Sequence, residues 1–299
     1  MLKPHRASIQ ELDEKGEAEK LAGLLPSLTL AAAHQTSAHD IGVHGRRRTG
    51  IGEDFWQFKQ YGPDDATTSI DWRQSAKREH VFIRQKEQET SESVWFWCDN
   101  TVTMKYASRT AETNKASRAS VLTMALALLL SQGGEKFGLF GHSEKAATGS
   151  TAFNKFAADM NRRGEFNFDT FLKTSRLPRK STIVMISDFL APIENLKTAI
   201  RTFVDLGCNG LLVHVADPAE VDLPFSGRTR FEGLSDEEGM TIGRVESVQS
   251  EYQDLFREHR QAVITLASQF SWEYAFHRTD ENASSILAEA FEALQVKGV

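Results

Sequence analysis

One acidic and two hydroxyl-bearing residues follow directly after a strongly apolar run. Residues 94–98 (Val-Trp-Phe-Trp-Cys) are mostly β-branched or aromatic and predict a strand buried on both faces. Asp99 ends this strand, and Thr101 and Thr103 follow at alternate positions. Ligands bind open α/β sheets at the carboxyl ends of strands, and such oxygens suit Mg²⁺ or a similar hard cation. By itself the stretch leaves an alternative open, in which Asp99 caps a turn and the threonines bond to the local backbone.

A second apolar run ends in the same way. Residues 181–186 (Ser-Thr-Ile-Val-Met-Ile) predict a buried strand, which ends in Ser187 and Asp188. Right-handed crossovers make neighbours of successive parallel strands, so Asp99 and Asp188 are expected side by side at one edge of the sheet. Two acids and two hydroxyls at that edge predict an octahedral magnesium site completed by water.

Strand patterns alternate with helix patterns over the rest of the chain, which predicts a mainly parallel sheet covered by helices on both faces, an α/β fold. A helix predicted from Asn114 to Ser131 is apolar nearly all round in its second half and should be buried. Further strands are expected at 137–141, 210–215 and 272–276, further helices at 151–162, 168–175, 192–207, 247–270 and 284–295, and a hairpin over 225–245.

The first 90 residues have a different character. A helical pattern over residues 8–33, interrupted by Pro26, is expected to pack on the body of the protein. Short β patterns at 55–61 and 81–86 predict a small β-module. We therefore divide the chain into residues 1–90, an N-terminal helical arm with a β-module, and residues 91–299, an α/β domain.

Composition is that of a soluble globular protein, with 40% hydrophobic and 25% charged residues among 299. A formal net charge of −6 argues against a general nucleic-acid binder. Cys98 and Cys208 both lie in apolar surroundings and are expected to be reduced. No signal-peptide pattern begins the sequence, and its longest apolar run is too short to be a transmembrane segment. These features predict a cytoplasmic protein, with peripheral membrane association left open.

Four segments upstream of Asp99 form an ordered pattern: Gly50–Phe55, Tyr61–Asp65, Ile70–Lys77 and Val81–Glu89. Together they resemble the signature of the family called Domain of Unknown Function 58. The resemblance covers about residues 42–104, and the remainder resembles the von Willebrand factor A-like (Rossmann-like) domain of that family. We interpret the signature as a folded corner joining the β-module to the core, with Trp72 as its buried plug.

The resemblance implies a metal-ion-dependent adhesion site, built from an Asp-x-Ser-x-Ser loop, a threonine of a second loop and an aspartate of a third. Asp99, Thr101 and Thr103 match the first loop, with threonines in place of both serines. Asp188 matches the acid of the third loop. The second loop departs from the pattern, because Glu165 stands where a threonine is usual. The implied magnesium ligands are therefore Asp99, Thr101, Thr103 and Asp188, with Glu165 as an uncertain substitute.

The resemblance also implies a function without catalysis: protein binding with a MoxR-type AAA+ ATPase, in a chaperone-like maturation of protein complexes that involves an unidentified client. A metal at Asp99 would then bridge to an acidic side chain of the partner. The alternative is a Mg²⁺-dependent haloacid-dehalogenase-like phosphatase with Asp99 as nucleophile. Against it, Thr101 stands where such enzymes carry their second aspartate, which acts as general acid.

Overall fold

The chain forms two compact units, which we describe separately. One comprises Met1–His34 and Glu92–Val299, and the other comprises Gln35–Ser91. The N-terminal helix therefore belongs with the α/β unit, whereas the division predicted from the sequence placed it with the β-module in residues 1–90. The computed structural model describes residues 6–28, 48–49, 55–60, 72–75, 81–88, 93–162, 180–233 and 239–296.

The smaller unit contains the predicted β-module. Strand β3 (Phe82–Gln88) lies between β1 (Arg48–Thr49) and β2 (Phe55–Gln60), and both pairings are antiparallel. The one-turn helix α2 (Trp72–Ser75) begins at Trp72, whose surface is 69% exposed. The prediction that Trp72 is a buried plug is therefore wrong, because a single turn leaves its indole in solvent.

The larger unit is built on a five-stranded sheet, with the order β10-β7-β6-β4-β5. All four neighbouring pairs are parallel, so the predicted α/β class with a mainly parallel sheet is confirmed. The strands are β4 (Ser93–Cys98), β5 (Lys136–Leu139), β6 (Thr182–Ser187), β7 (Asn209–Ala216) and β10 (Glu273–Arg278).

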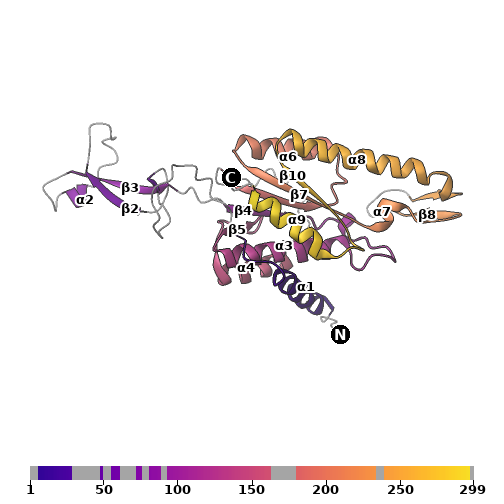
Figure 1. Ribbon diagram of the computed structural model, residues 1–299, viewed down its shortest axis with the longest axis horizontal. Helices are drawn as coiled ribbons and strands as arrows, with labels where there is room; N and C mark the ends of the chain where they lie inside the picture. Colours follow the sequence, from indigo (N-terminus) through magenta and orange to yellow (C-terminus); the bar gives the residue numbers. More distant parts are fainter. Residues whose placement is uncertain are drawn as a thin grey trace. The chain divides into compact units, whose positions relative to one another are not determined.

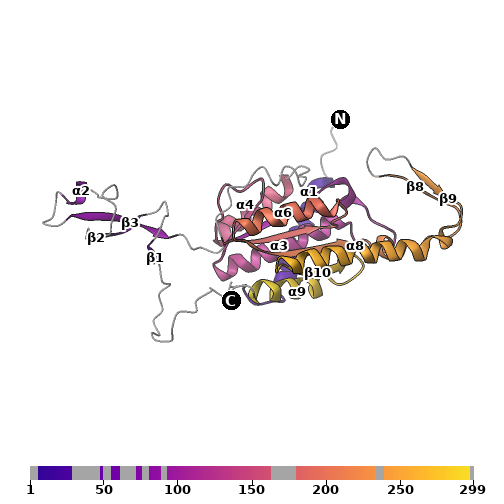
Figure 2. The ribbon, with the colours of Figure 1, turned by 90° about the horizontal axis from the view of Figure 1, so that it is seen from above.

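Helices cover both faces of this sheet (Figures 1 and 2). Helices α3 (Lys115–Gly133), α4 (Gly149–Arg162) and α9 (Ala283–Val296) share a hydrophobic core with one face. Helices α6 (Ile193–Asp205) and α8 (Gln249–Gln269) share a second core with the other. The short helix α7 (Pro218–Asp222) follows β7, and the strands β8 (Thr229–Phe231) and β9 (Met240–Ile242) form the predicted hairpin.

Residues 94–98 of β4 are apolar without interruption, and the structure shows why. Val94, Phe96 and Cys98 point into the core beneath α3, whereas Trp95 and Trp97 point into the core beneath α6 and α8. Successive side chains of a strand point to opposite faces, so a strand covered on both sides needs an apolar residue at every position. All six residues of β4 are buried, and this strand places Asp99 at the edge of the sheet.

Helix α3 is buried nearly all round because another helix covers the side that faces away from the sheet. Helix α1 (Arg6–Ala22) packs along it, with Ala18 and Ala22 fully buried. The chain continues in contact beyond α1, where the Leu28 N–H donates to the Leu129 carbonyl oxygen at 3.0 Å. The expected packing of the arm on the body is thus observed, although α1 ends well before the predicted residue 33.

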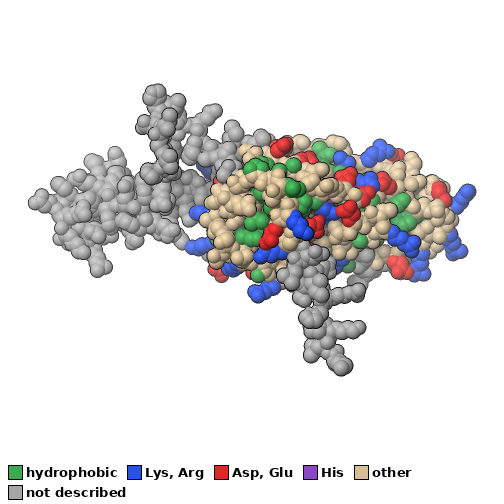
Figure 3. All heavy atoms as spheres, turned by 60° about the horizontal axis from the view of Figure 1, so that its bottom comes forward, with side chains coloured by type: hydrophobic (Ala, Val, Ile, Leu, Met, Phe, Trp, Pro, Cys, Tyr) green, Lys and Arg blue, Asp and Glu red, His purple; other side chains and the backbone are tan. Residues whose placement is uncertain are grey.

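The surface of the α/β unit mixes charges of both signs. Acidic and basic side chains are interspersed on the face that Figure 3 shows, as expected from a small net charge of −6. None of the helices in the described part of the chain combines the length and the hydropathy needed to cross a membrane.

Candidate functional site at the carboxyl edge of the sheet

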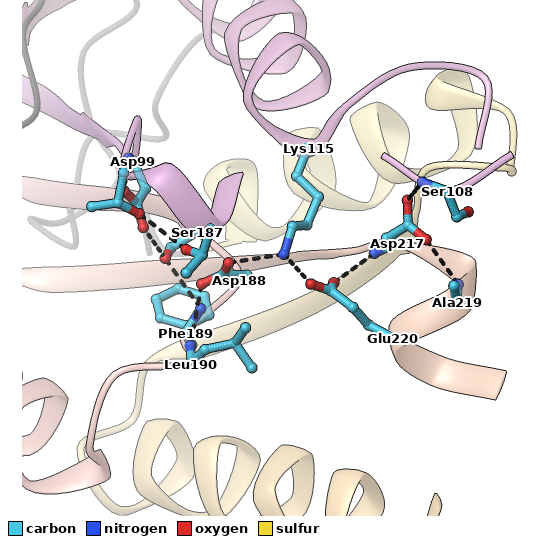
Figure 4. Close-up of polar contacts among 12 residues, drawn as sticks. Asp99, Ser108, Lys115, Ser187, Asp188, Phe189, Leu190, Asp217, Ala219 and Glu220 are labelled. Atoms are coloured by element: carbon cyan, nitrogen blue, oxygen red, sulfur yellow. Dashed lines mark hydrogen bonds and ion pairs between the residues drawn. The ribbon is translucent and has the colours of Figure 1, made fainter. Parts of the chain in front are cut away.

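The two acids that end β4 and β6 lie at the same edge of the sheet, as predicted. The strands pair in parallel, and the Asp99 N–H donates to the Ile186 carbonyl oxygen at 2.9 Å. Figure 4 shows Asp99 and Asp188 at this carboxyl edge, with Ser187 between them. The sequence prediction that these strands are neighbours is confirmed.

Asp99 is held by hydrogen bonds within the chain. Its side chain accepts from the Thr101 N–H at 2.9 Å on Oδ1 and from the Ser187 Oγ–H at 2.7 Å on Oδ2. Burial raises the pKa of Asp99, although these two bonds oppose the rise and the charge of Asp188 adds to it. Only 5% of the surface of Asp99 is exposed. Its hydrogen bonds connect the loop after β4 to Ser187 at the end of β6.

The two threonines lie close together after Asp99. Thr101 precedes the 3₁₀ turn η2 (Val102–Lys105), which contains Thr103, and their hydroxyl oxygens are 3.1 Å apart, within hydrogen-bond distance. Both residues are half-buried. The structure therefore brings Asp99, Thr101 and Thr103 together as one loop, as the sequence predicted.

Asp188 has a cationic partner that the sequence analysis missed. The Lys115 ammonium donates to Asp188 Oδ2 at 2.9 Å, and the Leu190 N–H donates to Oδ1 at 3.2 Å. Lys115 is the first residue of α3, after the N-cap Asn114, and its side chain is 0% exposed. A fully buried lysine therefore reaches the carboxyl edge from the start of the central helix (Figure 4).

A second carboxylate completes this cluster. Lys115 also contacts Glu220 Oε1, while Glu220 Oε2 accepts from the Asp217 N–H at 2.9 Å. Asp217 in turn caps α7, with Oδ1 accepting from the Ala219 N–H and Oδ2 from the Ser108 N–H, both at 2.8 Å. The capping box of α7 thus positions the Glu220 carboxylate next to the ammonium of Lys115.

We call Lys115, Asp188 and Glu220 the ionic cluster. Desolvation lowers the pKa of Lys115, but the charges of Asp188 and Glu220 outweigh it, so the pKa is raised and the ammonium stays charged. Burial raises the pKa of Glu220, and the nearby Lys115 charge opposes that rise. Each of the two carboxylates has a donor on both oxygens, and together they accept two of the three N–H groups of the Lys115 ammonium.

Two sequence signals could have revealed the ionic cluster. Lysine in the first turn of a helix is unfavourable to the helix dipole, and here it begins a helix predicted to be buried. Lys115 therefore needed an acidic partner. Asp217 and Glu220 are separated by three positions, the spacing of a capping box just after a strand. Only tertiary packing brings Lys115 and Glu220 together, and the sequence pattern does not reveal that packing.

The predicted magnesium ligands can be compared with this geometry. Glu165 lies outside the described residues. In the described part of the chain, no three His, Cys, Asp or Glu side chains are grouped to hold a metal. Both oxygens of Asp99 and of Asp188 already accept hydrogen bonds, and the Lys115 ammonium lies 2.9 Å from Asp188. A divalent ion about 5 Å from that ammonium would be repelled by about 7 kcal/mol at an effective dielectric constant of about 20. The Asp188 carboxylate therefore fits poorly as a ligand of Mg²⁺. The assignment of Asp99, Thr101, Thr103 and Asp188 as metal ligands stays a prediction.

A tight turn follows Asp188 and presents one apolar side chain to solvent. Phe189 is buried and has a φ of +48°, in the left-handed region that non-glycine residues rarely adopt. The turn is fixed by a bond from the Phe189 N–H to Ser187 Oγ at 3.1 Å and by His259 Nε2, 2.8 Å from the Phe189 carbonyl oxygen. Leu190, the next residue, is 46% exposed. Such strain persists only where the surrounding structure enforces it, often at functional sites.

The profile of a protein family described as "Protein of unknown function DUF58" matches residues 57–262, which include most of β2, both acids and the ionic cluster. The chain belongs to the DUF58 family. This confirms the resemblance recognised in its sequence, while the von Willebrand factor A-like detail and the MoxR association stay predictions. No match was found among curated proteins.

Two solved structures are similar to this DUF58 chain. The first, described as the conserved hypothetical protein BatB from Bacteroides thetaiotaomicron, has 12% identity and a TM-score of 0.41, and the match covers 69% of this chain and 98% of that one. The second, an aerotolerance-related membrane protein from Bacteroides fragilis NCTC 9343 with multiple mutations to serines, has 10% identity and a TM-score of 0.40, with 68% and 98% covered.

Proposed function

We propose that this DUF58 protein is a non-enzymatic adaptor and that the carboxyl edge of its sheet binds a partner protein. The proposed partner is a MoxR-type AAA+ ATPase, and the pair would act in the cytoplasm on a client complex during its maturation. The observation that carries the proposal is the strained turn at Phe189, which holds Leu190 in solvent beside a rigid polar edge.

The construction of the edge supports binding rather than chemistry. Asp99 and Asp188 are only 5% and 3% exposed, and hydrogen bonds within the chain engage both oxygens of each. A phosphatase nucleophile needs a carboxylate oxygen that can reach phosphorus, so this geometry disfavours Asp99 in that role. Leu190, in contrast, offers a fixed apolar anchor next to polar groups, which is the pattern of an interface centre and its rim.

Family membership supports the choice of partner. The resemblance recognised in the sequence implies an ATPase of the MoxR type, and the matched residues 57–262 contain Asp99, Asp188 and the turn that presents Leu190. A rigid recognition surface favours binding to such an ATPase, because a pre-organised surface loses little conformational entropy on binding. The braced loops at Asp99 and Asp188 provide that rigidity.

Capture of a co-encoded MoxR-type ATPase by the immobilised chain tests this function. We expect Leu190→Asp to lower the amount captured at least about tenfold, because a charge would be desolvated at the interface centre. Leu24→Asp is the matched control: Leu24 is 68% exposed but lies just after α1, near the end of α3 that is remote from the edge. Its capture should equal that of the wild type.

Equal capture by Leu190→Asp and the wild type would contradict the proposed surface. A phosphomonoesterase activity that requires Mg²⁺ and is abolished by Asp99→Asn would instead establish the phosphatase alternative and overturn the adaptor function.

A further inference from the structure

The Lys115 ammonium lies at the carboxyl edge, beside one of the acids that were expected to bind a metal ion. Lys115 is fully buried and lies 2.9 Å from Asp188, the acid that the family resemblance assigned to the third metal-binding loop. An ammonium carries three donors and no acceptor, so its neighbours must be acceptors. Here those neighbours are the carboxylates of Asp188 and Glu220.

The other carboxylate oxygen of each of these acids also accepts a hydrogen bond. Backbone N–H groups of Leu190 and Asp217 donate to Asp188 Oδ1 and Glu220 Oε2. A metal ligand would instead present a carboxylate oxygen to the ion, and Mg²⁺ demands near-ideal octahedral geometry from its ligands. Donors of the chain itself thus bind every oxygen of the two carboxylates, and the cation among these donors is the side chain of the first residue of α3.

We infer that the Lys115 ammonium takes the place of a divalent cation beside Asp188, so that this edge is neutralised and held together by the chain alone. A soluble ion can dissociate, whereas Lys115 is present whenever α3 is packed. Asp188 is then a structural ligand of Lys115, and the rigidity of the 187–190 turn does not depend on the metal concentration. This inference stands independently of the identity of the partner.

The wild-type full-length chain gives the first test. We expect the same thermal midpoint with millimolar Mg²⁺ and with excess EDTA, and no stoichiometric Mn²⁺ binding by electron paramagnetic resonance. Tight binding of one Mn²⁺ per chain that is lost in Asp188→Asn would overturn the inference.

The Lys115→Ala variant gives the second test, because it removes the charge and leaves room for a hydrated ion between the two acids. We expect its Mn²⁺ affinity to be at least about tenfold higher than that of the wild type, since repulsion by the ammonium is gone. The double variant Lys115→Ala/Asp188→Asn is the control and should lose this gain. A folded Lys115→Ala chain with no gain in affinity would show that the ammonium does not stand in for an ion. Should Lys115→Ala not fold, the wild-type measurements decide the question alone.

Discussion

Lys115→Met is expected to lower the free energy of unfolding of the α/β unit by about 3–5 kcal/mol, the usual cost of removing one partner from a buried ion pair. Methionine replaces most of the volume of the lysine stem, so the loss arises from the charge rather than from a cavity. Asp188 and Glu220 would keep their buried positions, with side chains 5% and 18% exposed, but lose their common cation. Urea unfolding followed by circular dichroism measures the change.

The matched control for this variant is Lys197→Met on α6. Lys197 pairs with Glu194 at 3.5 Å, but its side chain is 43% exposed. Exposed pairs contribute little, and we expect a change within about 0.5 kcal/mol. In addition, Asp188→Asn should lower the free energy of unfolding much less in the Lys115→Met variant than in the wild type. Equal effects of Lys115→Met and Lys197→Met would contradict the account of the ionic cluster.

Acidification from about pH 7.5 to about pH 5 is expected to destabilise the protein by about 2 kcal/mol through each of two buried histidines. Burial lowers the pKa of His214 to about 3 and that of His277 to about 4, from an ordinary value of 6.5. Between these values the unfolded chain binds protons that the folded chain does not. Each histidine therefore contributes its full stabilisation above pH 6.5. This contribution is lost as the pH falls from 6.5 toward the lower pKa of the folded state.

Both rings lie in surroundings that cannot accommodate a charge. His214 and His277 are each 1% exposed, and the Nε2 atom of each is buried without a hydrogen-bond partner in the described structure. His214 is also packed against Phe189 and Phe276, with ring centroids 5.7 and 5.2 Å away. Protonation of His214 would place a charge in an aromatic core, and protonation of His277 would place a buried charge close to the Arg118 guanidinium.

Single and double glutamine variants at these positions isolate the effect. Each of His214→Gln and His277→Gln should remove about half of the loss of stability between the two pH values, and the double variant nearly all of it. The raised pKa values of Asp99 and Glu220 act in the opposite direction, with stability falling as the pH rises above their unfolded values. Both acids are present in every variant and cancel in the comparison. A double variant with the same pH dependence as the wild type would contradict this prediction.

The fold was readable from local sequence because its strongest signals are local. The uninterrupted apolar run of β4 indicated burial on both faces, and the acids at the ends of β4 and β6 gave the position of the edge. The burial of α3 followed from its apolar second half. In each case the residues that specify the structure lie within one element, and the crossover rule supplied the relation between elements.

The ionic cluster was not readable in the same way, because its members come from three distant segments. Lys115, Asp188 and Glu220 lie on α3, after β6 and on α7, and only tertiary packing joins them. The exposure of Trp72 and the packing of α1 on α3 depend likewise on contacts beyond the local pattern. The local signs were a lysine at the start of a buried helix, which needs an acidic partner, and the capping-box spacing of Asp217 and Glu220.

Hydrogen exchange measured by mass spectrometry, with and without the MoxR-type ATPase, tests the central claim that the carboxyl edge is the docking surface. We expect slower exchange in the complex for the amides of residues 188–191, in the turn that presents Leu190. Exchange over residues 24–28, near the end of α3 that is remote from the edge, should be unchanged. Unchanged exchange over residues 188–191 in a complex that protects another surface would contradict this docking surface.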